Sequence, residues 1–310
     1  MPERPAAVLN LTIDAMSGKI VTGLRDAGVP SLLLKGPVIA RRLYRDGEVR
    51  PYADCDLLVR RSDLAIAEAT VAGLGMLRDN AEERLTPKWE RHHSSWRIEE
   101  RHFDLELHWT LIHVGADPET LWEVCTRDSN AMRVGGVELP TPADPQLALI
   151  LALHAAQHGV QWNRPQEDLR RAVAVLPPEV WRAAAQVAVE LNATRGFAAG
   201  LRLIPSGAAL AKTLGLPDEP SFEVLLTTGR AGVQALQFDR FLRAPGLVAK
   251  ARVVLRAAFP SAASMRSRHI AASGHVGLAL SYAIQPIRVV RRIGLGVRHW
   301  RRARRETNGR

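Results

Sequence analysis

Residues 29–59 read VPSLLLKGPVIARRLYRDGEVRPYADCDLLV, and this stretch decides the fold. Its first apolar run, 29–34, has the length and composition of a buried strand. The turn Lys35-Gly36-Pro37 ends that strand, and a helix is predicted over 38–46. Residues 52–59 form a second predicted strand, in which polar and apolar residues alternate before an apolar end. The segment therefore predicts two strands of one sheet, joined by a short helix.

Asp54 and Asp56 lie on the second of these strands. Side chains at positions i and i+2 of a strand project from the same face, so the two carboxylates point together. Two such charges raise each other's proton affinity, and a bound divalent cation removes the conflict. Mg²⁺ is commonly held by one or two carboxylates together with substrate phosphates. The alternative is a pair of solvated surface acids, but an exposed strand rarely continues into an apolar run such as Leu57-Leu58-Val59.

A third carboxylate would complete a two-metal phosphoryl-transfer site. The predicted strand 103–109 offers candidates, because Asp104, Glu106 and His108 alternate with apolar residues and share one face. The spacing alone leaves Asp104 and Glu106 equally open.

Positive charge and glycine precede the acidic strand. Glycine at the Lys35-Gly36 turn allows backbone N–H groups to approach a phosphate, and lysine adds a point charge. Pro37 removes one N–H that such a loop could use. Arg50 lies in the loop that enters the acidic strand, which makes it the preferred functional arginine among those at 41–50.

At this point the chain resembles a known family, the uncharacterised nucleotidyltransferases of the DNA polymerase β-like superfamily. The family pattern has a lysine-glycine turn, a tyrosine, an arginine, a D-x-D-L-L-V strand and a helix that ends at glycine. The matching residues are Lys35, Gly36, Tyr44, Arg50, Asp54, Asp56 and Gly75.

The resemblance continues downstream and covers roughly residues 30–295. LELHWTL at 105–111 matches a family segment with an acidic residue two positions before His-Trp, which favours Glu106 over Asp104. LALHAAQHGVQWNRPQEDLRRAV resembles a helical block with two histidines, a tryptophan and an aspartate. VVLRAAFPSAASMRSR is similar to a late family segment. The residues matched in the helical block are His154, His158, Trp162 and Asp168.

The resemblance implies an α+β fold, with a nucleotidyltransferase-type mixed sheet flanked by helices and followed by an α-helical C-terminal domain. It implies a metal-dependent transfer of a nucleoside monophosphate from an NTP, most favourably ATP, to an unknown small-molecule, peptide or protein acceptor. Two Mg²⁺ ions would be held by the carboxylates of the acidic strands. The implied metal ligands and catalytic residues are Asp54, Asp56 and Glu106, and the implied nucleotide contacts are Lys35, Gly36, Arg50 and Tyr44.

Two features differ from active superfamily members, which commonly carry glycine-serine or glycine-glycine at the first turn, nearer to the D-x-D pair. This chain has Gly36-Pro37, and 18 positions separate Gly36 from Asp54. The Gly36-Pro37 turn favours an alternative of another class, a non-catalytic nucleotide- or partner-binding protein with a degenerate site. The three candidate carboxylates in the expected strands favour the enzyme.

A change in amino-acid composition along the chain predicts the domain organisation. An α/β domain is expected over 1–141 and an Ala-, Leu- and Arg-rich helical domain over 142–280, followed by a basic tail over 281–310. The tail holds nine arginines and one acid, Glu306. Such a tail attracts polyanions or an acidic partner, although it also fits a final amphipathic helix with a basic end.

The composition, 46% hydrophobic and 24% charged, is that of a globular chain. There is no signal-like N-terminus and no apolar run long enough for a transmembrane segment, and only two cysteines are present. We therefore expect a cytoplasmic location.

His154 and His158 lie four positions apart on a predicted helix. The intervening Ala155-Ala156-Gln157 lacks the glutamate of a zinc-protease H-E-x-x-H motif. The pair is interpreted either as packed helix residues, bonded to backbone or to Asp168, or as contacts to nucleotide or acceptor. His92-His93 has too little sequence context to assign.

Overall fold

The computed structural model describes residues 6–45, 47–79, 91–98, 103–227, 231, 233–244, 246–259 and 274–308. The sequence also predicts a strand over 95–99, and its last residue, Glu99, lies outside these ranges. Residues 260–268 of the late family-like segment lie outside them as well. The chain forms two compact units, Met1–Asp218 and Glu219–Arg310, and each is described by itself.

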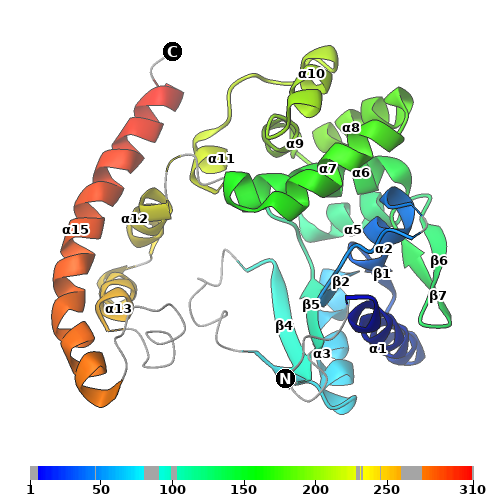
Figure 1. Cartoon of the computed structure of the whole chain (residues 1–310), viewed down its shortest axis with the longest axis horizontal. Helices are drawn as coiled ribbons and strands as arrows, with labels where there is room; N and C mark the ends of the chain where they lie inside the picture. The colour runs from blue at the N-terminus through cyan, green and yellow to red at the C-terminus, as the bar shows by residue number, and fades with distance from the viewer. Residues whose placement is uncertain are drawn as a thin grey trace. The chain divides into compact units, whose positions relative to one another are not determined.

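The first unit is built on a five-stranded sheet with the strand order β1-β2-β5-β4-β3 (Figure 1). β2 and β5 are parallel, whereas the other neighbouring pairs are antiparallel. This arrangement confirms the predicted mixed sheet with flanking helices. The strands are β1 (Ser31–Leu33), β2 (Asp54–Val59), β3 (Leu77–Arg78), β4 (His93–Ile98) and β5 (Phe103–His108).

The parallel pairing of β2 with β5 brings the two acidic strands together. Asp54 lies opposite Asp104, and Asp56 lies opposite Glu106. Parallel neighbours need a crossover connection. Here the crossover contains the helix α3 (Leu64–Gly73), which follows the 3₁₀ turn η1 (Arg61–Asp63).

Helix α1 (Ala6–Asp26) packs on the sheet through contacts with β1, β2 and β5, and it also contacts α3. Its buried residues recur at helical spacing, among them Ile13, Ile20 and Leu24, which are fully buried. The helical spacing of apolar residues at 5–28 predicts a helix that stops at Gly28, and α1 confirms it.

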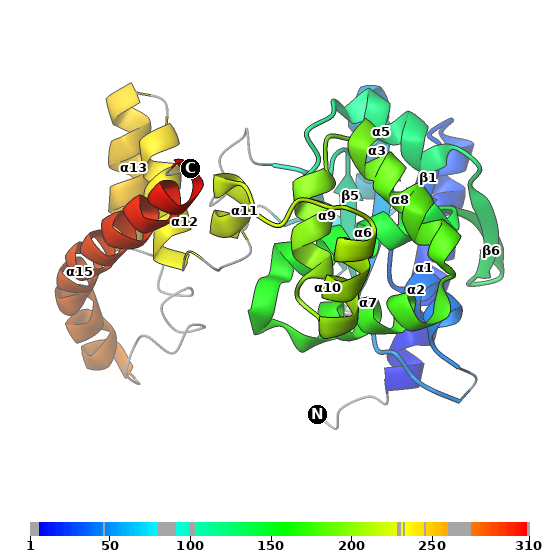
Figure 2. The ribbon, with the colours of Figure 1, turned by 90° about the horizontal axis from the view of Figure 1, so that it is seen from above.

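A hairpin of β6 (Asn130–Val134) and β7 (Val137–Thr141) lies beside α1 (Figure 2). In this region the apolar residues of Val137-Glu138-Leu139 predict a short strand, and β7 contains it. Sequence reasoning missed β6 and α5 (Pro118–Thr126), whose start is capped by Asp117. Gly135 and Gly136 both have positive φ, 59° and 84°, which suits the tight turn between the strands.

The remaining helices of this unit pack around α6, which is buried along most of its length and contacts α7, α8 and α9. They are α6 (Asp144–His158), η4 (Gly159–Gln161), α7 (Asn163–Val175), α8 (Pro178–Glu190), α9 (Thr194–Leu201) and α10 (Pro205–Thr213). The sequence predicts one helix over 200–214. That prediction is wrong, because α9 ends at Leu201 and Pro205, which cannot continue a helix, starts α10.

One hydrophobic core runs through the sheet and these helices, from Ile13 to Leu216. The domain boundary predicted at residue 142, between an α/β domain and a helical domain, stays a prediction.

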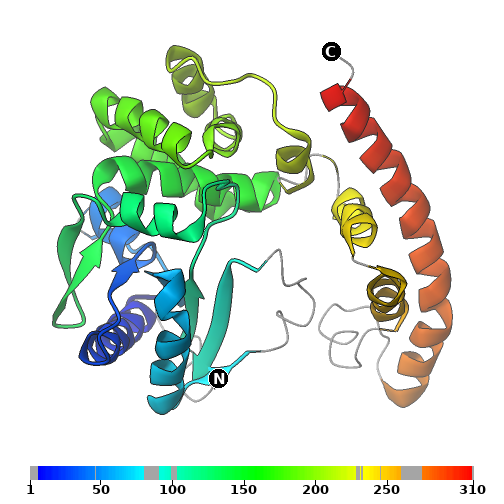
Figure 3. The ribbon, with the colours of Figure 1, turned by 180° about the vertical axis from the view of Figure 1, so that it is seen from behind.

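The second unit is helical (Figure 3). Its elements are α11 (Phe222–Thr227), α12 (Val233–Arg243), α13 (Gly246–Ala258) and α15 (Gly274–Asn308). The sequence predicts a helical region around 231–255, and the structure places α12 and α13 there, separated at Gly246, whose φ is 69°. The basic C-terminal segment is helical as far as Asn308.

Helix α15 packs along α12 and also contacts α11 and α13. Its buried residues fall on one face, among them Val289 and Ala303. The Trp300 indole donates to Asp239 Oδ1 of α12 at 2.9 Å. Within the described ranges, no helix combines the length and apolar character that crossing a membrane requires.

Candidate active site

Asp56 lies at the centre of a buried polar cluster. Its side chain is 2% exposed, and Oδ1 is 2.8 Å from Lys35 Nζ and 3.0 Å from His108 Nε2. His108 Nε2 also lies 3.1 Å from Glu106 Oε2. Backbone pairing sets this geometry, because the N–H of Leu34 donates to the Asp56 carbonyl and carries Lys35 past the end of β1.

The charges in this cluster are mutually dependent. Burial alone would raise the pKa of Asp56, but the Lys35 ammonium and the His108 ring hold that pKa well below its usual range. Burial likewise opposes the charged form of His108, yet hydrogen bonds to Asp56 and Glu106 raise its pKa. Burial opposes the ionised form of Glu106 most strongly, but the hydrogen bond with His108 and the charges of His108 and His93 together lower its pKa.

Asp54 shares the face of Asp56, but the nearby positive charges do not offset its burial as Lys35 and His108 do for Asp56. Burial, and then the charge of Asp56, raises the pKa of Asp54 to about 6, and the opposing effects of Lys35 and Arg50 are smaller. This carboxylate is therefore costly to keep ionised. A divalent cation bound at this face would supply the missing positive charge.

The donor atoms fit a divalent cation. One ligand atom each of Asp56, Glu106 and His108 lie within 4.8 Å of one another. Carboxylate oxygens are the ligands that Mg²⁺ prefers, and the imidazole adds a donor that transition metals accept. Asp54 lies outside this tight group but interacts electrostatically with Asp56 and Glu106.

Gly36 forms the turn between Lys35 and helix α2 (Pro37–Leu43). Its φ of 59° and ψ of −107° belong to a region that residues with a side chain rarely adopt. A Cβ there would lie 3.5 Å from the Asp54 carbonyl oxygen, so the turn runs close to the acidic strand.

Arg50 and Tyr44, predicted as nucleotide contacts, both bind Asp168 of α7. Arg50 forms a two-point ion pair, with Nε 2.8 Å from Oδ1 and one terminal nitrogen 2.6 Å from Oδ2. The Tyr44 hydroxyl donates to Oδ1 at 2.8 Å. Asp168 is fully buried and Arg50 is 6% exposed. This network holds the loop before β2 against α7, at the border of the carboxylate cluster.

The structure thus brings Lys35, Asp56 and Glu106 together with Asp54 close by, and it directs Arg50 and Tyr44 to Asp168. Sequence reasoning placed His108 on the face of Glu106 but gave it no role, although the alternation in β5 carried that signal. Asp104, the rejected alternative, is exposed.

Sequence reasoning also missed His93, which lies opposite His108 in the pairing of β4 with β5. Its Nε2 is 3.7 Å from Glu106 Oε1. Only the strand pairing reveals this position, because β4 and β5 are separate in the chain.

His154 and His158 approach the same cluster from α6, with ring centroids 4.6 Å apart. The pKa of each is lowered by burial and then by the positive charge of Lys35. Asp168, which the sequence suggested as their partner, is engaged by Arg50 and Tyr44. His158 also lies 5.5 Å from the ring of Trp162, whose side chain is 61% exposed.

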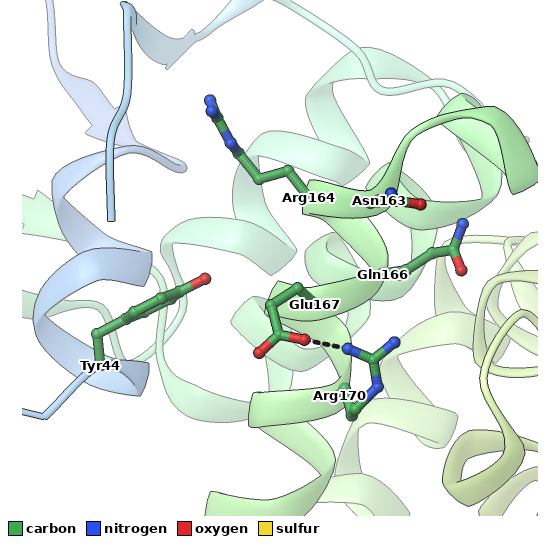
Figure 4. Close-up of a pocket in the computed structure, with 6 residues that line it drawn as sticks. All are labelled: Tyr44, Asn163, Arg164, Gln166, Glu167 and Arg170. Carbon is green, nitrogen blue, oxygen red and sulfur yellow. Dashed lines mark hydrogen bonds and ion pairs between the residues drawn. The ribbon is translucent and has the colours of Figure 1, made fainter. Parts of the chain in front are cut away.

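A hollow of about 500 Å³ lies between the end of α2 and the first turns of α7 (Figure 4). Polar and charged residues line it. One of them is Tyr44, which directly follows α2 and donates to Asp168. The lining residues are Tyr44, Asn163, Arg164, Gln166, Glu167 and Arg170.

The mixed sheet and its acidic strands define a nucleotidyltransferase-type protein. The family model described as uncharacterised nucleotidyltransferase matches residues 3–206, and the chain belongs to this family. No curated protein matches the chain.

Two solved structures are similar in part. The solution structure of the antibiotic-resistance factor ANT(2'')-Ia is 18% identical, covers 59% of this chain and 91% of its own, and has a TM-score of 0.39. A structure of tRNA-processing enzyme complex 3 is 11% identical, covers 94% of this chain and 91% of its own, and has a TM-score of 0.26. Both scores are low, and we draw nothing from them about this chain.

Proposed function

We propose that this protein transfers a nucleoside monophosphate from an NTP, with ATP the favoured donor, to a small-molecule, peptide or protein acceptor. The acceptor oxygen forms a bond to the α-phosphorus, and the bond to the β-phosphate oxygen breaks, releasing pyrophosphate. We base the proposal on family membership together with one observation. Asp56 and Glu106, on adjacent parallel strands, converge with Lys35 in a buried cluster.

Asp54, Asp56 and Glu106 would hold two Mg²⁺ ions. Bound there, the ions would supply positive charge that stabilises the negative charge developing on the phosphates during transfer. The chain's own residues contribute position and charge. Glu106 would take up the acceptor's proton, since the raised pKa of His108 favours a ring that already carries both protons. Lys35 supplies positive charge for the leaving pyrophosphate, at the cost of its ion pair with Asp56.

In this proposal Arg50 and Tyr44 act indirectly and do not contact the nucleotide. Their contacts with Asp168 fix the loop that enters β2, so they position Asp54 and Asp56. A direct contact between Arg50 and phosphate would require Arg50 to leave a buried two-point ion pair.

Calorimetric titration of each of the four NTPs, with and without Mg²⁺, tests the proposal. Native protein should bind one NTP only when Mg²⁺ is present. Asp56→Asn should remove that binding and any turnover, with the fold intact by circular dichroism. Asp104→Asn is the matched control, because Asp104 is an exposed acid on the neighbouring strand, and it should bind as the native protein does. An Asp56→Asn variant with near-normal turnover would contradict the metal assignment.

A second candidate function is binding without catalysis, with the second unit docking on a polyanion or an acidic partner. The charge distribution favours it. Residues 219–310 hold seventeen Lys and Arg against four Asp and Glu, whereas residues 1–218 hold twenty-five against twenty-eight. The whole positive excess of the chain thus belongs to one unit.

Salt dependence tests this second function. Binding to single-stranded RNA or to heparin should weaken steeply as salt rises, because each neutralised charge releases counterions. Replacing the exposed Arg298, Arg301 and Arg305 of α15 by Gln should reduce the affinity and the salt slope. Binding that is insensitive to salt and to these substitutions would exclude an electrostatic contact.

A further inference from the structure

A second group of side chains lies beside the carboxylates. One nitrogen each of His92, His93 and His108 lie within 4.8 Å of one another. The ring centroids are 4.3 Å apart for His92 and His93, 5.1 Å for His93 and His108, and 5.9 Å for His92 and His108. His93 and His108 are direct neighbours across β4 and β5, so the backbone ladder fixes two of the three rings.

Two of these rings carry a buried nitrogen in need of a partner. Among the residues that the structure describes, Nδ1 of His93 and Nδ1 of His108 make no hydrogen bond. His108 is 3% exposed, so water has little access to it. A buried polar atom without a hydrogen-bond partner lowers the stability of the fold. Three imidazoles brought together at this cost indicate a ligand that uses ring nitrogens.

We propose that His92, His93 and His108 bind a divalent transition-metal ion of the Zn²⁺ class, beside the position that the carboxylates offer to Mg²⁺. Imidazole nitrogen suits Zn²⁺, whereas Mg²⁺ prefers oxygen ligands. Glu106 Oε1, 3.7 Å from His93 Nε2, is close enough to supply an oxygen for the fourth position. The ion would join the start of β4 to the end of β5.

This site goes beyond the proposed function and does not depend on it, because the histidines would bind the ion without any nucleotide. The alternative is a packed group of rings that binds no ion. The two possibilities differ in their response to added metal.

The experiment uses full-length protein without a histidine tag. Zn²⁺ is titrated calorimetrically, and Co²⁺ is added separately as a spectroscopic probe. The native chain should bind one Zn²⁺ that excess Mg²⁺ does not displace, and bound Co²⁺ should show the visible absorption of a tetrahedral site. His92→Gln and His93→Gln should each weaken Zn²⁺ binding at least about tenfold, since even outer-shell changes cost that much.

His158→Gln is the matched control. His158 is a partly buried histidine that interacts electrostatically with Glu106 and Asp56. It lies outside the group of His92, His93 and His108, so the Zn²⁺ affinity of His158→Gln should be unchanged. Equal Zn²⁺ affinity in native, His92→Gln and His93→Gln proteins would overturn the proposal. Displacement of Zn²⁺ by Mg²⁺, or its loss in His158→Gln, would do the same. If His93→Gln unfolds, His92→Gln decides, because His92 precedes β4.

Asp54→Asn separates this site from the proposed function. It should abolish Mg²⁺-dependent NTP binding and leave Zn²⁺ binding intact. Histidine-dependent Zn²⁺ binding in a protein that binds no NTP would sustain the metal site and reject nucleotidyl transfer.

Discussion

Breaking the buried ion pair between Arg50 and Asp168 from one side should strongly destabilise the first unit. The perturbation is Asp168→Asn, which keeps the size of the side chain but removes its charge. Arg50, only 6% exposed, then keeps its charge without a counterion, and the Tyr44 hydroxyl faces a weaker acceptor. Breaking a buried pair on one side costs about 3–5 kcal/mol, whereas an exposed pair contributes about 0–1 kcal/mol.

Equilibrium unfolding in urea measures this cost, with tryptophan fluorescence as the signal. Residues 1–218 contain six of the seven tryptophans, so the signal reports chiefly on the first unit. Glu190→Gln is the control, because it breaks a two-point pair with Arg127 in which the side chains are 51% and 40% exposed. The control should lose no more than about 1 kcal/mol.

A double-mutant cycle tests whether the loss comes from the pair. Arg50→Met should also destabilise, because it leaves the Asp168 charge buried. The double variant, Arg50→Met with Asp168→Asn, should lose less than the sum of the two single variants, by about 1–3 kcal/mol. Additive losses, or an Asp168→Asn cost as small as that of the control, would refute the reasoning. Loss of NTP affinity in Arg50→Met without loss of stability would instead favour a direct phosphate contact.

Two further predictions concern the site. The folded-state pKa of Asp54, about 6, is above the unfolded value of about 3.9, so ionised Asp54 opposes folding above pH 6 and the penalty fades as pH falls. Asp54→Asn should therefore stabilise the metal-free protein by at most about 3 kcal/mol at pH 8 and by almost nothing near pH 4. Urea titrations at both pH values measure this difference in unfolding free energy. A difference that does not change with pH would contradict the prediction. Gly36→Ala should destabilise the protein by about 1–3 kcal/mol in thermal unfolding, because φ at this position is 59°. Gly73→Ala in helix α3 is the control and should show no such loss, because an added Cβ there has no neighbouring atom within 4 Å. Equal melting temperatures for the two alanine variants would mean that the turn is not strained.

Local sequence determined the two strands within residues 29–59 and the residues of the acidic strands, whereas β6 and α5 were missed. The run before Lys35 and the alternation around Asp54 specify strands by composition and period, and both strands lie where the pattern predicts them. Glu106 was separated from Asp104 only by resemblance to the family. Helix ends were less well determined where Pro205 and Gly246 divide long apolar patterns into two helices each.

The tertiary structure decided what the charged side chains contact. Asp168 is more than a hundred positions from Arg50, and no local pattern indicates that the two form a buried pair. The same holds for His93 and His108, because their proximity depends on the antiparallel pairing of β4 with β5. Sequence period fixes which face of its own strand a side chain occupies. Only the order and register of the strands fix which charges and rings share that face, since these depend on the packing of the whole sheet.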